Sequence, residues 1–308
     1  MDKINAFGRD NQANELKFID WQWREYKLIF EEKIKKQQIH NLFYSGLCEG
    51  PEGLEYSFVP TTMMLDYEIA IKQLYDKIEV TDNSVALCNE VFYTSKIEGA
   101  KTTLLVTQHI HDGKYTATSD FSENMIASGF KATKYLNVIG NRLDLDVLLK
   151  VWDILVEGAC QNSSIRGERF RTGNVQVGKH VGLNPQLLDD AMSNWVNYYN
   201  SSTLNDHPFI KAALLHFAFE FIHPFCDGNG RCGRLLMNNF LIGQGYDKIK
   251  AISFSRSIEQ YRLEYDVALA AGDNTYADCT KFIEFILTMM RLAMTDALEG
   301  RLDVVAEN

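Results

Sequence analysis

The strongest hydrophobic pattern in the chain runs from residue 210 to residue 221. Its apolar residues fall at positions i, i+3, i+4, i+7, i+8 and i+11, which are Ile210, Ala213, Leu214, Phe217, Ala218 and Phe221. Residues at this spacing share one face of an α-helix. The pattern therefore predicts a helix at the centre of the hydrophobic core.

Weaker helical spacing predicts further helices on both sides of this segment. They cover residues 14–38, 60–78, 83–98, 122–138 and 143–157, and helical spacing resumes after residue 185. Gly99 directly follows the third of them, in the position of a helix stop. The chain is therefore predicted to be mainly helical, including the region up to about residue 105.

One segment has a different character. Between residues 166 and 185, glycines at positions 167, 173, 178 and 182 frame a short alternating stretch at 174–177, which predicts a small β-hairpin. The expected fold class is all-α, a helical bundle with one small hairpin flap. We expect an N-terminal helical region over residues 1–105, a core over 106–295 and a polar tail over 296–308.

Composition disfavours some classes of function. The chain has 308 residues, with 41 acidic and 31 basic side chains and a formal net charge of −10. No basic surface is therefore expected, which argues against nucleic acid as a partner. A hydrophobic content of 46% with only five prolines favours a packed helical protein over disorder.

No targeting or membrane signal is visible. Charged residues interrupt the first 16 residues, so no apolar signal core is present. No apolar run approaches the roughly 20 residues of a membrane span. The six cysteines form no CxxC pair, which is typical of reduced thiols. We expect a cytoplasmic protein that does not bind a membrane.

The candidate chemistry lies in the loop after the central helix. Gly228 and Gly230 alternate there with Asp227 and Asn229. Because glycines adopt left-handed backbone angles, several N–H groups of such a loop can point into one concavity that binds an anion. The following helix adds its positive N-terminal end to the same place.

Four side chains next to this concavity indicate the kind of ligand. Arg231 and Arg234 are three residues apart and able to face one ligand, which favours a polyphosphate. Asp227 would repel a bare phosphate, but it suits a Mg²⁺ ion shared with phosphate oxygens. His223, with an ordinary pKa of roughly 6.5, can accept a proton from a hydroxyl near neutral pH. This combination predicts nucleotidyl or phosphoryl transfer.

Other site types fit the loop less well. His223, Cys226 and Cys232 match no common zinc spacing, and a fourth ligand is not evident. A calcium loop that starts at Asp227 would need glutamate at its twelfth position, where the chain has Asn238. A Walker loop fails because no Gly-Lys-Ser/Thr follows.

At this point the loop resembles the signature of the Fic family. His223-x-Phe225-x-Asp227-Gly228-Asn229-Gly230-Arg231-x-x-Arg234 matches that signature at all eight of its specified positions. Residues 171–175, about fifty residues upstream, and the later Tyr265-x-x-Ala268-Leu269 also look like Fic sequences. The resemblance covers about residues 85–290 of the chain.

The resemblance implies a Fic-type helical bundle that acts as a protein adenylyltransferase. Such an enzyme transfers AMP from Mg-ATP to a Ser, Thr or Tyr hydroxyl of a protein target, which can be the enzyme itself, and releases pyrophosphate. The implied partners are therefore ATP and a protein with an exposed hydroxyl residue. A homo-oligomer is left open.

The resemblance also implies a role for each matching residue. His223 would deprotonate the hydroxyl, Asp227 would hold Mg²⁺, and Phe225 would pack inward and anchor the loop. The implied nucleotide-binding residues are Gly228, Asn229, Gly230, Arg231, which supports the β-phosphate, and Arg234, which pairs with the γ-phosphate. The implied target-docking flap, which would add the target as a short strand, includes Thr172, Gly173, Asn174 and Val175.

A second resemblance lies upstream. Thr94-x-x-x-Glu98-Gly99 matches the inhibitory motif of Fic proteins, [Ser/Thr]-x-x-x-Glu-[Gly/Asn]. A bidentate pair between Glu98 and Arg234 would occupy the guanidinium that the γ-phosphate needs. The resemblance thus implies an enzyme that is repressed at rest. In some relatives this glutamate also supports removal of AMP, and that activity is left open here.

Two other hypotheses keep the same fold. Relatives of this family also transfer UMP, phosphate or phosphocholine, and a third alternative is a regulatory module that binds nucleotide without turnover. An intact His223 argues against the module, because a protein that only binds nucleotide needs no base there. We interpret His207, His216 and Tyr265 as structural residues, since such side chains on helices more often belong to the core.

Overall fold

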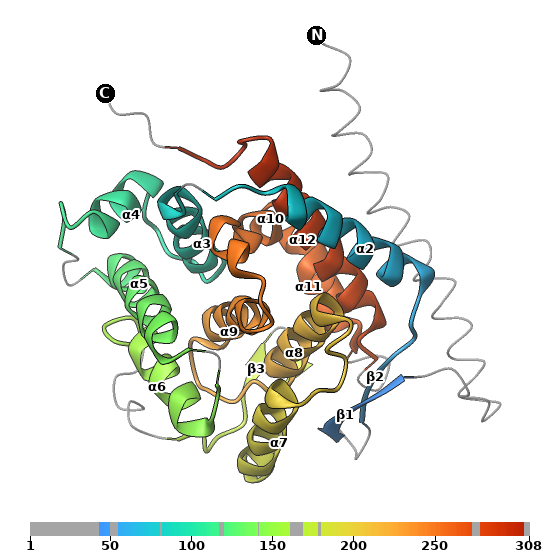
Figure 1. Ribbon diagram of the computed structural model, residues 1–308. Helices are drawn as coiled ribbons and strands as arrows, with labels where there is room; N and C mark the ends of the chain where they lie inside the picture. The colour runs from blue at the N-terminus through green and yellow to red at the C-terminus, as the bar shows by residue number, and fades with distance from the viewer. Residues whose placement is uncertain are drawn as a thin grey trace.

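The computed structural model describes residues 43–49, 55–80, 82–116, 120–140, 142–160, 169–177, 180–272 and 278–304. These ranges are mostly helical (Figure 1), which confirms the all-α fold class. None of the helices in the described ranges combines the length and the apolar character that crossing a bilayer requires. The helix predicted over residues 14–38 lies outside the described residues.

The helices predicted over residues 60–78, 83–98, 122–138 and 143–157 are present, with ends shifted by one or two residues. The helices of the described residues are α2 (Thr62–Lys77), α3 (Ser84–Ile97), α4 (Leu104–His111), α5 (Phe121–Ile139), α6 (Leu145–Leu155), α7 (Leu188–Asn200), α8 (Pro208–Ile222), α9 (Asn229–Gly243), α10 (Phe254–Gln260), α11 (Arg262–Ala270) and α12 (Thr280–Leu298). Two short 3₁₀ helices, η3 (Pro185–Leu187) and η4 (Asp247–Ala251), precede α7 and α10.

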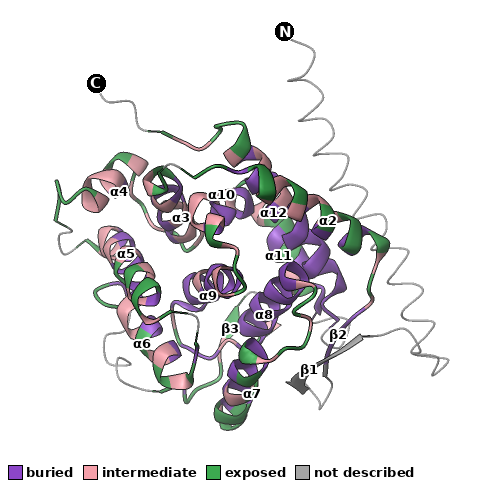
Figure 2. Ribbon diagram, viewed as in Figure 1, coloured by how far each residue is buried: buried purple, intermediate pink, exposed green. Residues whose placement is uncertain are grey.

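Helix α8 is the centre of the core, as its sequence pattern predicts. All of its residues are buried (Figure 2), and it packs against α9, α12 and α7. Pro208 occupies its first position, where the missing N–H costs no helical hydrogen bond. A fully buried Leu or Phe side chain stabilises a fold by about 1.5–3 kcal/mol. The loop after α8 therefore starts from a rigidly held helix.

Helices α2 and α3 belong to the same packed body as the later helices. Thr61 caps α2 by accepting a hydrogen bond from the Met64 N–H at 3.2 Å, and α2 lies along α12. Helix α3 packs against α10, α4 and α5, and it also contacts α9. The C-terminal end of α3 therefore lies next to the N-terminal end of α9, although the two are far apart in the sequence.

Two small antiparallel sheets accompany the helices. Strands β3 (Gln176–Val177) and β4 (His180–Val181) form the predicted hairpin, and β3 begins two residues after the start of the alternating stretch 174–177. Strands β1 (Phe43–Glu49) and β2 (Glu55–Phe58) form a second hairpin. The expectation of a wholly helical region up to residue 105 is wrong there. Tyr56 of β2 packs edge-on against the Phe217 and Phe221 rings of α8, and this tertiary contact stabilises a strand that local pattern does not reveal.

Candidate active site

The loop between α8 and α9 begins and ends with left-handed backbone conformations. His223 ends α8 with φ 51° and ψ 61°, and Gly228 precedes α9 with φ 80°. Glycine adopts a positive φ without strain, whereas a histidine does so only when the surrounding contacts hold it. The loop therefore turns the chain sharply and places His223 close to the first turn of α9.

The side chain of Asn229 closes this loop from within. Its Oδ1 accepts a hydrogen bond from the Phe225 N–H at 2.9 Å, and its Nδ2 donates to the Phe225 carbonyl at 2.7 Å. The buried Phe225 ring stacks on Trp152 with centroids 4.5 Å apart, which confirms that Phe225 packs inward and anchors the loop. Trp152 also donates a hydrogen bond to the Asp227 carbonyl. The amide of Asn229 thus shapes the loop in this structure.

The Glu98 carboxylate lies directly over the first turn of α9. A β-carbon on Gly230 would collide with Glu98 Oε1 and would lie 3.0 Å from Arg234 Nη1. Only glycine therefore leaves room for the carboxylate at this position. The first N–H groups of a helix have no partner within the helix and favour an anion. An acidic side chain thus occupies the region predicted to receive phosphate.

Arg234 ties α9 to α3 through two residues of the upstream motif. Its Nη2 lies 2.7 Å from Glu98 Oε1, while its Nε donates to Thr94 Oγ1 at 2.8 Å. The predicted bidentate pair is therefore wrong in detail, because the guanidinium is shared between the carboxylate and Thr94. Burial alone would raise the pKa of Glu98, but the charge and hydrogen bond of Arg234 outweigh it and hold that pKa below its ordinary value.

Arg231 points in a different direction from Arg234. Its Nη1 and Nη2 donate to the carbonyls of Leu155 and Ala159 at 2.8 and 3.2 Å, at the C-terminal end of α6. The expectation that both arginines face one ligand does not hold in this arrangement. Helix C-termini carry carbonyls without helical partners and attract cations. Arg231 thus fastens α9 to α6, with Nη2 3.9 Å from the Asp227 carboxylate.

The His223 ring is oriented by the last turn of α8. Its Nδ1 lies 3.3 Å from the Glu220 carbonyl, an acceptor, so we assign the proton to Nδ1 and the free lone pair to Nε2. Burial lowers the pKa of His223 to about 4, and this effect exceeds the opposing one of the Glu220 hydrogen bond. The imidazole is therefore neutral at neutral pH and able to accept a proton at Nε2.

Arg171 holds the flap against the end of α8. Its Nε donates to the His223 carbonyl at 2.7 Å, and its Nη1 donates to the Gly173 carbonyl at 2.8 Å. Its Nη2 reaches the carbonyls of Leu183 and, at 3.3 Å, Ile222. No role for Arg171 was predictable from its neighbours in the sequence. A buried arginine surrounded by carbonyls is recognisable only after the flap and α8 have been brought together.

The predicted flap is exposed as far as the structure describes it. Thr172, Gly173 and Asn174 are exposed, Val175 is partly buried, and Val177 and Val181 are more than half exposed, at 52% and 58%. Strand edges with exposed backbone and side chains can pair with another extended segment. The flap thus has the surface that docking of a peptide strand requires.

Asp227 is the acidic residue at the mouth of the loop. Its side chain is 29% exposed, and its Oδ1 lies 3.9 Å from Nη2 of Arg231 in the first turn of α9. Within the described ranges, no group of three or more His, Cys, Asp or Glu side chains could hold a metal ion. Mg²⁺ commonly binds one or two carboxylates together with substrate phosphates, and a single aspartate fits that mode.

A buried polar cluster lies behind the loop. The Tyr265 hydroxyl lies 3.1 Å from His216 Nε2, and His216 Nδ1 lies 3.7 Å from Glu220 Oε1. Burial raises the pKa of Glu220 to about 8 and lowers that of His216 to about 3, so both groups are neutral near pH 7. Tyr265 and His216 are thus part of the core. His207 instead pairs with Glu68 on α2 at 2.7 Å.

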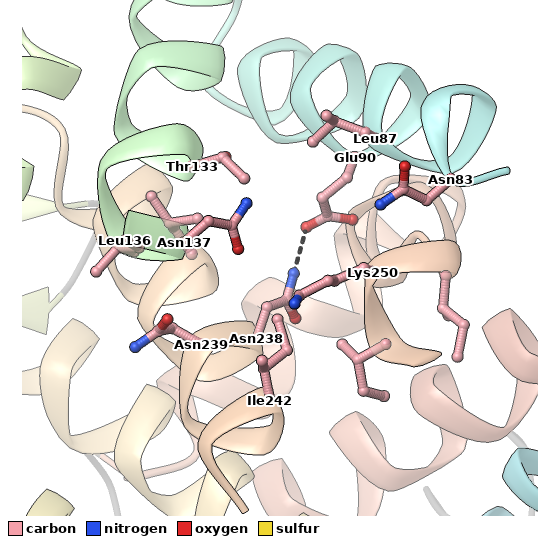
Figure 3. Close-up of a pocket in the computed structure, with 13 residues that line it drawn as sticks. Asn83, Leu87, Glu90, Thr133, Leu136, Asn137, Asn238, Asn239, Ile242 and Lys250 are labelled. Carbon is pink, nitrogen blue, oxygen red and sulfur yellow. Dashed lines mark hydrogen bonds between the residues drawn. The ribbon is translucent and has the colours of Figure 1, made fainter. Parts of the chain in front are cut away.

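A separate pocket of about 570 Å³, open mouth included, lies between α3, α5, α9 and η4 (Figure 3). Figure 3 shows Asn238 of α9 bonded to Glu90 of α3 across it. The pocket is lined from α9 by Leu235, Asn238, Asn239 and Ile242. These residues follow the first turn of α9, so the pocket is distinct from the loop before α9 and from Glu98.

Fold and site together define a class of helical proteins in which a glycine-containing loop joins a helix that ends at a histidine to a second buried helix. Residues 142–241 match the Fic/DOC family model. Over these residues the chain is a member of the Fic/DOC family.

Several curated relatives of this chain are insect proteins. The chain is 34% identical over 170 residues to Protein adenylyltransferase Fic of Drosophila yakuba, a match covering 53% of this chain and 34% of that protein. It is 31% identical over 221 residues to the protein of the same name from Aedes aegypti, covering 71% of this chain and 40% of that protein. The chain thus spans well under half the length of these relatives.

Solved structures share the fold at lower identity. A Fic family protein from Desulfovibrio desulfuricans G20 superposes with a TM-score of 0.69 at 21% identity, covering 80% of this chain and 78% of that one. Fic-1 (residues 134–508) from C. elegans gives a TM-score of 0.64 at 19% identity, covering 78% of this chain and 73% of that one. At these identities the likeness concerns the fold alone.

Proposed function

We propose that this protein is a protein adenylyltransferase that transfers AMP from Mg-ATP to a hydroxyl of a protein, and that Glu98 represses it. The observation that carries the proposal is the Glu98 carboxylate over the first turn of α9, paired with Arg234 at 2.7 Å. This anion stands where the resemblance puts nucleotide phosphates. The name of the insect relatives, Protein adenylyltransferase Fic, supports the same reaction.

His223 is the proposed general base. Its Nε2 accepts the proton of the target hydroxyl while the hydroxyl oxygen forms a bond to the α-phosphorus of ATP. The bond between the α-phosphorus and the oxygen bridging to the β-phosphate breaks, and pyrophosphate leaves with that oxygen. A low pKa of His223, about 4, keeps the imidazole unprotonated at neutral pH. Its ring is already oriented by the Glu220 carbonyl, so little rearrangement precedes proton transfer.

Asp227 is the proposed ligand of Mg²⁺. A bound Mg²⁺ would offset negative charge on the phosphates and help to orient them. Asp227 lies at the mouth of the loop. Its backbone carbonyl accepts a hydrogen bond from Trp152 Nε1 at 2.9 Å, which helps to hold the residue there. The α9 N-terminus, with Gly228 and Gly230, would receive phosphate oxygens through backbone N–H groups.

Glu98 is the proposed inhibitory residue. Its carboxylate and the γ-phosphate of ATP would compete for the Arg234 guanidinium, which Thr94 also holds. Arg234 is almost fully buried, so it has no second position in solvent from which to bind phosphate. Because its pKa is lowered, Glu98 stays ionised at neutral pH and the repression persists there.

The flap is the proposed docking site for the target. Its exposed backbone near Thr172, Gly173 and Asn174 is able to pair with an extended segment of a protein. Arg171 connects this backbone to the carbonyl of His223. A target strand on the flap would therefore be placed at a fixed distance from the base.

The proposal is tested with α-labelled ATP and purified protein. Glu98→Gly is expected to increase label incorporation by at least tenfold, into the protein itself or an added target, because it frees Arg234. Adding His223→Ala to that variant is expected to lower the rate by roughly 10²–10⁴, the usual contribution of a general base. Mass spectrometry then locates AMP on a Ser, Thr or Tyr residue.

Labelled UTP in parallel controls for the donor. Label that persists without His223 would contradict the base assignment. Tight binding of ATP by the Glu98→Gly variant without any transfer would favour a regulatory module instead.

A further inference from the structure

Helix α3 presents two lines of residues to two different neighbours. Along the first line, at i, i+4 and i+8, Glu90 accepts a hydrogen bond from Asn238 at 3.1 Å, and Thr94 and Glu98 both contact Arg234. Residues four apart lie on one face of a helix. This face runs along α9 and ends at the loop.

The second line of α3 faces the C-terminal segment 301–304. Asn89 Nδ2 donates to the Asp303 carbonyl at 2.8 Å, and the Asp303 N–H donates to Asn89 Oδ1 at 3.2 Å. One amide side chain thus binds both backbone groups of Asp303, as a neighbouring strand would. One turn later, the Tyr93 hydroxyl donates to Asp303 Oδ2. Asn89 and Tyr93 lie on either side of Glu90 in the sequence and share its helix.

Arg256 of α10 completes the recognition of Asp303. Its Nε and Nη2 donate to the two carboxylate oxygens of Asp303 at 3.1 and 3.2 Å, and its Nη1 contacts Asp296 at 2.8 Å. Burial alone would raise the pKa of Asp303, but hydrogen bonds from Arg256 and Tyr93 hold it below its ordinary value. A fork of two hydrogen bonds from one arginine selects a carboxylate in a defined orientation.

We propose that Asn89, Tyr93 and Arg256 form a docking site for an extended, aspartate-bearing segment, that residues 301–304 occupy it in this chain, and that its occupation holds α3 where Glu98 reaches Arg234. The proposal rests on the proposed function of Glu98 as the inhibitory residue. We name these three residues and Asp303 the Asp303 site.

The geometry of a helix connects the Asp303 site to the active site. An α-helix advances about 1.5 Å per residue and moves as a rod over a few turns. Asn89 and Tyr93 hold this rod from one side, and Glu98 stands a little more than one turn beyond Tyr93. An axial shift of about one residue would therefore pull Glu98 away from its 2.7 Å contact with Arg234.

A second anchor keeps α3 folded when the Asp303 site is weakened. Glu90 accepts hydrogen bonds from Ser253 Oγ at 3.0 Å and from the Ser255 N–H at 2.9 Å, at the start of α10. These contacts do not involve Asp303. Substitution of Asp303 should therefore loosen the position of α3 without unfolding it.

The test measures transfer of α-labelled AMP by the intact chain carrying Asp303→Asn or Asp303→Lys. Loss of one charge-assisted contact commonly changes an equilibrium by about 1.4 kcal/mol, which is tenfold. We expect about a tenfold rise in basal transfer for Asp303→Asn and a larger rise for Asp303→Lys, which faces Arg256 with a like charge. In the Glu98→Gly background, neither should raise transfer further.

Asp66→Asn is the matched control, because it removes the same charge from an exposed position on α2. Two outcomes would overturn the proposal. One is that Asp303→Asn raises AMP transfer equally in the presence and absence of Glu98→Gly. The other is that Asp303→Asn alone does not raise transfer although Glu98→Gly alone does. Hydrogen exchange of α3 amides gives a readout that needs no activity. Exchange should be faster in Asp303→Asn than in Asp66→Asn, and equal rates would also overturn it. Absence of transfer in Glu98→Gly itself would instead count against the proposed function.

Discussion

The loop before α9 and helix α3 both lie next to the first turns of α9, but they are held in place by different kinds of contact. The backbone of the loop is closed by residues close in sequence: Asn229 binds the backbone of Phe225, and the His223 N–H bonds to the Phe219 carbonyl within α8. Trp152 and Arg171 support this loop from outside. Helix α3 is instead positioned by side chains more than 130 residues away, such as Arg234 and Asp303.

This difference indicates which part of the site adjusts. Contacts that are local in sequence re-form quickly and with little entropy cost, whereas distant contacts depend on the whole packed body. When α3 loses one of its distant contacts, α3 is therefore expected to move while the loop keeps its shape. We expect the machinery for transfer to be preformed and its repression to be adjustable. Three predictions test that contrast, from the largest expected effect to the smallest.

The first concerns a side-chain support of the loop that comes from the flap. Arg171→Gln in the Glu98→Gly background removes the hydrogen bonds to the carbonyls of His223 and Ile222. Displacement of a reacting group by about 1 Å can cost on the order of 10² in rate. We expect kcat to fall by about that factor, with little change in the affinity for ATP. The kcat of Arg171→Lys should lie between that of Arg171→Gln and that of the parent Glu98→Gly variant. An equal loss of nucleotide affinity would mean that Arg171 supports the fold generally.

The second concerns the space shared by carboxylate and phosphate. Gly230→Ala places a methyl group against Glu98 and Arg234, at the first turn of α9. Overpacking typically costs 1–3 kcal/mol, so ATP affinity should fall about tenfold even when Glu98 is replaced by glycine. Calorimetric titration with ATP measures this change. Gly173→Ala, where the added carbon meets nothing within 4 Å, is the control. Unchanged affinity would place the phosphates elsewhere.

The third concerns pH. Because burial lowers the pKa of His223 to about 4, the neutral base is present above that pH and is lost as pH falls through it. The kcat of the Glu98→Gly variant should therefore change less than about twofold between pH 5.5 and 7.5. A stopped assay over that range measures the profile. A midpoint near the ordinary histidine value of roughly 6.5 would contradict the burial of His223 seen here.

Sequence alone was enough to predict what depends on local pattern. The spacing of apolar residues predicted α8, and the alternation of glycines with Asp227 and Asn229 predicted the loop. Gly99, as a helix stop directly after Glu98, predicted the end of α3, and it has φ 86° in the structure. These features follow from periodicity and turn chemistry, which residues within a few positions of each other determine.

Features that depend on distant partners were not predictable in this way. The polar segment 296–308 gave no sign that Asp303 binds α3, and nothing near Arg231 indicated that it turns to the end of α6. Strand β2 packs its Tyr56 on α8, far along the chain. The nearest usable signal for Arg171 was its place as the first residue of the segment 171–175, which resembles Fic flap sequences. A cation in that position still needed coordinates to show its carbonyl partners.

Helix α8 has a consequence for how this architecture can diversify. Every one of its residues is enclosed by neighbours, so almost any exchange along it disturbs packing on several sides at once. Substitutions in α8, the helix that ends at His223, are accordingly a poor source of differences in substrate specificity. New specificity would have to arise at the rim, where strands β3 and β4 expose Val177 and Val181 and can be rewritten at small cost to the rest of the molecule.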